Sequence, residues 1–165
     1  MNARDLLVQQ FALVYDVSAA NLDGMTHEDS LVSVGGGNCA NWILGHLVNV
    51  HNGVMRLAGA EPVWEDPQLE RAGWDPIDDP SKAIDWEPLR TRFLASRGRC
   101  LDAIGRLSDD ALDEEVPDPF GGTTTRGALL GLISTHQWYH VGQLGIARRA
   151  AGRAGAIKGP GQPRR

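Results

Sequence analysis

Three histidines are the residues whose types and spacing could do chemistry in this chain. His136 and His140 stand four positions apart, so on a helix they lie one above the other on the same face. His46 lies in a separate apolar stretch. Two imidazoles from adjacent turns of one helix, with a third from a facing helix, can bind one divalent metal ion and leave coordination positions open.

The apolar periodicity predicts that these three histidines point inward. On a helix, His136 and His140 fall within an arc of about 80° that also holds the apolar residues of their segment. His46 falls on the apolar seam of its own segment, whereas His51 lies about 140° away and does not share that face. The seam residues are Leu129, Ile133, Leu144 and Ala147 in the later segment and Ile43, Leu47, Val50, Val54 and Leu57 in the earlier one.

Each histidine taken alone has another explanation, as a core residue hydrogen-bonded to a carbonyl or a neighbouring side chain. The coincidence of three inward histidines favours the metal site, because one ion satisfies a ring nitrogen on each of them. The segment between His136 and His140 begins with Gln137 rather than glutamate. A zinc protease needs a glutamate there as general base, so this class is excluded. Gln143, three residues after His140, could orient a ligand or a bound water, or simply pack between helices.

Four periodic segments must position these residues, and they predict an all-α, four-helix bundle. The expected helices cover about residues 3–22, 39–58, 86–107 and 125–151, with Asn38 as the N-cap of the second. Short capped turns are expected at 26–29 and 108–111. We expect one domain over residues 1–152 and a flexible tail over 153–165, which is rich in Gly, Pro and Arg.

One long connection, residues 61–85, separates the second and third predicted helices. It is acidic and contains four prolines together with Trp64 and Trp74. Such a loop is either a lid over a site or a packed surface excursion. The two tryptophans could line a pocket mouth or pin the loop to the bundle. Trp138 is expected to point away from the histidines, toward a packing or dimer contact.

Composition limits the partners. The chain has 165 residues and a formal net charge of −5, so it lacks the basic surface that nucleic-acid binding needs. The sequence shows neither an apolar run of about 20 residues nor a signal-peptide pattern, and we expect a cytoplasmic protein with no membrane partner. Cys39 and Cys100 lack CxxC spacing and are predicted to be reduced, buried thiols.

Two motifs resemble the DinB/YfiT superfamily of small four-helix bundles. They are Asn41-Trp-Ile-Leu-Gly-His46-Leu and His136-Gln-Trp-Tyr-His140-Val-Gly-Gln143-Leu. The resemblance implies a bundle with one long crossover, frequent homodimers, and ligation of zinc, nickel, iron or manganese by His46, His136 and His140. It implies no single reaction, since similar proteins include thiol-dependent transferases and a maleylpyruvate isomerase that uses a low-molecular-weight thiol.

The sequence therefore predicts a metal-dependent enzyme that activates water or a thiol for hydrolysis or thiol transfer to a small molecule. The expected ion is zinc or nickel before iron or manganese, and a low-molecular-weight thiol is a candidate cofactor. The alternative is a non-catalytic metal-binding or ligand-binding dimeric bundle related to stress response. A third hypothesis is a metal-free dimerising bundle whose histidines are merely packed.

Overall fold

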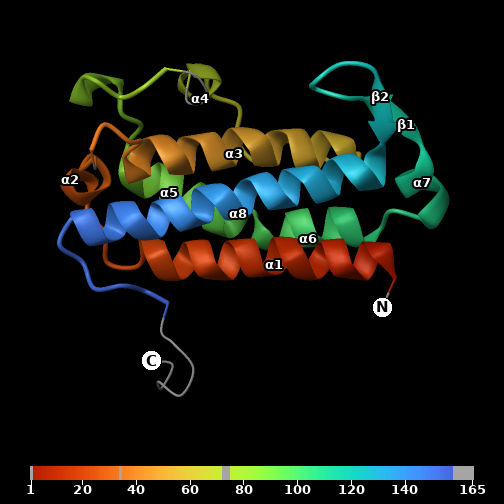
Figure 1. Cartoon of the computed structure of the whole chain (residues 1–165), viewed down its shortest axis with the longest axis horizontal. Coiled ribbons are helices and arrows are strands. Elements are labelled where there is room, and N and C mark those ends of the chain that lie inside the picture. Colours follow the sequence, from red (N-terminus) through yellow and green to blue (C-terminus); the bar gives the residue numbers. More distant parts are fainter. Residues whose placement is uncertain (1, 34, 72–74, 158–165) are drawn as a thin grey trace.

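Long helical segments lie side by side and form the body of the molecule (Figure 1). The computed structural model describes residues 2–33, 35–71 and 75–157. The long segments are α1 (Ala3–Leu22), α3 (Ala40–Leu57), the consecutive helices α5 (Trp86–Ala95) and α6 (Arg97–Gly105), and α8 (Arg126–Ala150). The predicted four-helix bundle is confirmed, and the expected ends of all but the third segment agree to within one residue.

The connections carry the short elements. These are α2 (His27–Ser30), α4 (Pro67–Arg71), the 3-10 helix η1 (Pro80–Lys82), α7 (Asp109–Asp113) and an antiparallel hairpin of β1 (Glu115–Pro117) and β2 (Thr123–Thr125). Both predicted capped turns are present. Thr26 and Asp29 form a reciprocal capping box around α2, and the Ser108 side chain caps α7. The hairpin was not predicted, because strands of three residues leave almost no periodic signal.

The order of the helices in space brings the two histidine-bearing helices together. α8 lies between α1 and α3, and it runs in the same direction as α1 (Figure 1). Arg148 near the end of α8 donates to the carbonyl of Asn21 near the end of α1, at 2.9 Å. The core between the helices is filled by large side chains that exclude solvent, among them Phe11, Leu44 and Phe93. Leu44 of α3 and Leu144 of α8 belong to the same buried apolar cluster, so apolar packing joins the two histidine-bearing helices.

Two local predictions were wrong. The second helix begins at Ala40, and its N-cap position is taken by Cys39 without a side-chain cap, rather than by Asn38. The third helix is not continuous, because it divides at Ser96 into α5 and α6. The Ser96 hydroxyl donates to the carbonyl of Phe93 at 2.6 Å, and this local bond competes with the regular helical ladder.

The long connection is a packed excursion fastened to α3 by two asparagines. Asn41 donates to the carbonyl of Ile84 at 2.8 Å and accepts from its N–H at 3.0 Å. Asn52 donates to the carbonyl of Trp64 and accepts from the N–H of Val63, both at 2.8 Å. The Trp64 ring lies against the Arg92 guanidinium, 4.2 Å from the ring centroid. Trp64 therefore pins the loop, and Trp74 lies outside the described residues.

Removing one of these fasteners should cost stability. We expect Asn41→Ala to lower the free energy of unfolding by about 2 kcal/mol, because it leaves two buried backbone groups of Ile84 without partners. Urea denaturation followed by circular dichroism measures the change. The half-buried Asn49 on the same helix provides the control Asn49→Ala, for which a change under about 0.5 kcal/mol is expected. Equal effects of the two substitutions would contradict the fastening role of Asn41.

The cysteines, the absence of a predicted membrane span and the C-terminal boundary are the remaining expectations from the sequence. Cys39 and Cys100 are both buried free thiols, as predicted. No helix within the described residues is long and apolar enough to cross a bilayer. Arg153, the first residue of the expected tail, forms an ion pair with Asp29 at 2.6 Å. The division into a domain of 1–152 and a tail of 153–165 stays a prediction, since residues 158–165 lie outside the described part of the chain.

Candidate metal centre

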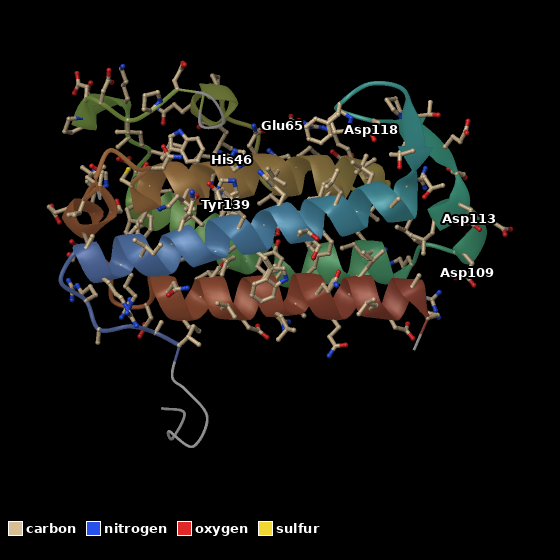
Figure 2. All side chains as sticks on the ribbon, in the orientation of Figure 1. His46, Glu65, Asp109, Asp113, Asp118 and Tyr139 are labelled. Atoms are coloured by element: carbon tan, nitrogen blue, oxygen red, sulfur yellow. The ribbon has the colours of Figure 1, made fainter. Side chains whose placement is uncertain are left out.

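The three predicted histidines meet between α3 and α8. His136 Nε2 lies 3.1 Å from His140 Nε2 and 3.4 Å from His46 Nε2. All three ligand atoms fall within 4.8 Å of one another. His46 and the α8 residue Tyr139 lie at the same level of the bundle (Figure 2). The structure thus brings together the three histidines that the sequence singled out, and their role as metal ligands stays a prediction.

The spacing of these nitrogens fits a metal ion. Nitrogens about 2.0–2.1 Å from a tetrahedral zinc ion lie about 3.3–3.4 Å apart, and slightly closer around an octahedral ion. The two Nε2 separations fall close to that range. Neutral imidazoles also suit the role, because a lone pair is required for ligation. Burial lowers the pKa of His136 and of His140, which favours the neutral form of both.

The cluster is open on one side. His140 is buried, while His46 and His136 are partly exposed. The group contains no Cys, Asp or Glu from the described residues. The acidic residues Asp109 and Asp113 of α7 lie at the hairpin end of the molecule, away from His46 (Figure 2). An ion held by the three histidines would therefore keep at least one position for water or substrate.

Aromatic rings frame the histidines. Trp42 stacks on His46 with ring centroids 5.1 Å apart and an interplanar angle of 11°, and it tilts toward His140 at 6.0 Å. The Tyr139 ring meets His140 edge-on at 5.0 Å. Trp42 also lines a pocket beneath the long connection, together with Asn41, Gln68, Asp75, Pro76, Ile77, Lys82 and Ile84. The ring of Trp42 is thus a wall shared by that pocket and the histidine cluster.

Gln143 contacts His140, one of the three clustered histidines, directly. Its Oε1 lies 2.8 Å from His140 Nδ1, so Nδ1 carries the proton and donates to the carbonyl oxygen. The lone pair of a neutral His140 is then on Nε2, the atom that faces the other two histidines. Gln143 therefore selects the tautomer of His140 that can bind a metal.

This contact makes a prediction about affinity. Gln143→Leu should weaken zinc binding by roughly tenfold, because His140 loses the acceptor that orients its ring. Competition titration with a zinc chelator measures the dissociation constant. Gln143→Glu keeps an acceptor at the same place and should retain or strengthen binding. The role assigned to Gln143 fails if leucine and glutamate leave the affinity equally unchanged.

The sequence missed a second polar cluster in the core. His51 was correctly placed away from His46, but its fully buried position and its partners were not foreseen. It contacts Tyr15 and Gln137, and Tyr15 also contacts Ser96. The sequence pattern that could have revealed this cluster is the helical spacing of its polar residues from the core. Tyr15 lies four residues after Phe11, and His51 lies four after an apolar seam residue.

Burial raises the pKa of the neighbouring Cys100 thiol to about 11, so the thiol stays protonated.

Comparison with known proteins places the chain in a family. The family model for the DinB superfamily matches residues 10–144. The chain belongs to the DinB superfamily. A search of curated proteins gives no match for this DinB-superfamily protein.

Solved structures with low sequence identity share the fold of this DinB-superfamily protein. YfiT from Bacillus subtilis, described as a probable metal-dependent hydrolase with an unusual four-helix bundle topology, superposes with a TM-score of 0.69 at 18% identity, covering 92% of this chain and 89% of its own. A mycothiol-dependent maleylpyruvate isomerase gives a TM-score of 0.65 at 17% identity. That match covers 88% of this chain and 61% of the isomerase, so the isomerase is considerably longer.

Proposed function

We propose that this protein is a metal-dependent enzyme acting on a small molecule, with one divalent ion bound by His46, His136 and His140. The observation that carries the proposal is the meeting of the three histidines on a partly exposed face, with His136 Nε2 at ligand spacing from the Nε2 atoms of the other two. A divalent ion bound there would lower the pKa of a coordinated water or thiol and supply a nucleophile near neutral pH. Hydrolysis and thiol transfer are the reaction classes that such a nucleophile serves.

The chain's own residues have defined parts in this proposal. Gln143 holds the proton of His140 on Nδ1 and leaves Nε2 free to ligate. Trp42 supports the His46 ring by stacking and forms one wall of the pocket beneath the long connection. A small substrate with an apolar portion fits a site flanked by Trp42 and Tyr139. One fold relative is described as a probable metal-dependent hydrolase and another as a mycothiol-dependent maleylpyruvate isomerase, which supports hydrolysis and the use of a small thiol as candidate chemistries.

Zinc or nickel is the proposed ion, with iron and manganese as further candidates, because three imidazoles accept several first-row metals. A low-molecular-weight thiol is the proposed cosubstrate for the transfer reaction. The alternative function, a non-catalytic binding bundle, predicts a site closed by a fourth protein ligand. The open side of the cluster favours catalysis over this alternative.

A homodimer is part of the proposal. Trp138 and Ile146 on α8 expose 37% and 59% of their surface and border a groove between α1 and α8. Large apolar side chains that stay exposed on one helix are typical of a contact surface. Sedimentation or light scattering of the purified protein tests this point independently of the metal site.

Activity should depend on the metal. Protein loaded with zinc or nickel is screened against activated esters and against electrophiles in the presence of a small thiol. We expect a turnover that falls at least about a hundredfold in His46→Ala, because the ion loses a ligand and its position. His27→Ala changes a histidine on α2 outside the cluster, so it serves as the control and should keep the activity. Equal turnover in the parent and in His46→Ala would contradict the catalytic proposal.

A further inference from the structure

The core beside the metal centre contains a chain of four polar side chains, one from each long segment of the bundle. They are Gln137 of α8, His51 of α3, Tyr15 of α1 and Ser96 at the junction of α5 and α6. His51 Nε2 lies 2.7 Å from Gln137 Oε1, and His51 Nδ1 lies 2.6 Å from the Tyr15 hydroxyl. The Tyr15 hydroxyl lies 2.7 Å from Ser96 Oγ, which lies 2.6 Å from the Phe93 carbonyl. All four side chains are buried.

Counting protons shows which group donates and which accepts in each of these hydrogen bonds. The Phe93 carbonyl can only accept, so the single proton of Ser96 is used there. Tyr15 must then donate to Ser96, and the Tyr15 oxygen accepts from the Nδ1–H of His51. Burial lowers the pKa of His51 to about 4, so at neutral pH the ring carries only one proton. His51 Nε2 is therefore an acceptor that requires a donor from Gln137.

The amide of Gln137 can supply that donor by a half-turn. With Oε1 toward His51, two acceptors face each other, and Gln137 Nε2 is buried without a hydrogen-bond partner among the described residues. Rotating the amide by 180° exchanges oxygen and nitrogen with almost no change in shape. The NH₂ group then donates to His51 Nε2, and every contact in the chain has one proton. An unpaired carbonyl oxygen is left in the core, which is more readily tolerated than an unpaired N–H.

We propose that these side chains form a one-directional hydrogen-bond chain, running from Gln137 through His51 and Tyr15 to Ser96, that positions the two metal ligands of α8 against His46 of α3. Gln137 directly follows His136 in the sequence. His51 lies five residues after His46, about 7.5 Å along the axis of α3. The hydrogen-bond chain therefore joins the two ligand-bearing helices less than two turns from the point where their histidines meet.

Such a link matters because a metal site tolerates little displacement of its ligands. Productive ligand geometry has to be held within about 0.5 Å, whereas apolar packing alone lets helices slide by small amounts. Directional hydrogen bonds between buried groups resist this sliding, since any shift leaves a polar atom unpaired. Gln137, His51 and Tyr15 are accordingly positioning residues, and they do not touch the metal.

The direction of the chain is tested without any metal. Nitrogen-15 NMR of the histidine rings in metal-free protein at pH 7 distinguishes the two neutral tautomers. We expect the His51 proton on Nδ1, with Nε2 unprotonated. A proton on Nε2 would overturn the assigned direction, because Gln137 would then be the acceptor.

The positioning role, which rests on the proposed metal function, is tested by zinc affinity. Tyr15→Phe removes one hydroxyl from the middle of the chain, and Gln137→Leu removes its first donor. Each should weaken zinc binding by roughly tenfold in a chelator competition assay. Losses of this size are typical when a residue that orients a metal ligand is replaced. Ser134→Ala is the matched control, because Ser134 Oγ is a buried hydroxyl on α8 that has no hydrogen-bond partner among the described residues. Its zinc affinity should stay within about twofold of the parent.

The outcomes separate the two proposals. Parental zinc affinity in Tyr15→Phe and Gln137→Leu would overturn the positioning role while the metal site stands. If Gln137→Leu does not fold, the conservative Tyr15→Phe decides. A parent protein that binds no zinc would instead overturn the proposed function, and the NMR result on His51 would still decide the direction of the chain.

Discussion

Replacing His140 by alanine is expected to weaken zinc binding by at least about a hundredfold. Zinc sites with four protein ligands gain about 10–16 kcal/mol from binding, so one ligand accounts for about 2.5–4 kcal/mol. His140 is the most buried member of the cluster, and its position is further fixed by Gln143. Its loss leaves two ligands from different helices, which are too few to hold the ion.

The control for this experiment is another histidine. His27 lies on α2, outside the cluster, so His27→Ala reports how much zinc the protein binds adventitiously through histidine. It should bind zinc like the parent in chelator competition. The assignment of His140 as a ligand would be wrong if the two alanine variants had the same dissociation constant.

The second large effect expected is a loss of stability on mild acidification, caused by His51. Its pKa is lowered to about 4 by burial in the folded protein, whereas an unfolded histidine has a pKa of about 6.5. Between these values the unfolded chain binds a proton that the folded chain does not, so acid favours unfolding. The contribution is fully present above pH 6.5 and is lost as the pH falls toward 4. It amounts to about 3 kcal/mol.

Urea denaturation of metal-free protein at a series of pH values measures this contribution. The parent should lose stability from pH 7 to pH 5 more steeply than His51→Gln, whose side chain cannot titrate in this range. His136 and His140 change in the same direction in both proteins, so the difference between the curves isolates His51. Val54→Ala on the same helix should lower stability equally at every pH, as expected for a cavity. Parallel curves for the parent and His51→Gln would contradict the neutral, buried state of His51.

The bundle and its histidine cluster could be predicted because both follow from helical periodicity. His46, His136 and His140 occupy apolar seams of two helices, and seams must face each other in a bundle. The same pattern gave the ends of α1, α3 and α8 to within one residue. A family resemblance in the two motifs added the topology with one long crossover.

Features set by single hydrogen bonds could not be predicted in this way. The break at Ser96 depends on where one hydroxyl points, and apolar periodicity continues across it from Phe93 to Cys100. The absent cap at Asn38 is of the same kind, since a capping residue must also reach an N–H of the next turn. The partners of His51 come from three other segments of the chain, so only the folded arrangement reveals them.

The most direct test of the metal centre is the metal content of tag-free protein, measured by elemental mass spectrometry. The parent is compared with a variant in which His46, His136 and His140 are all alanine and whose helix content matches the parent by circular dichroism. The three converging histidines predict about one zinc or nickel ion per parent chain and none in the variant. A parent that stays metal-free after incubation with zinc, nickel, manganese and iron, or a variant that retains the ion, would contradict the assignment.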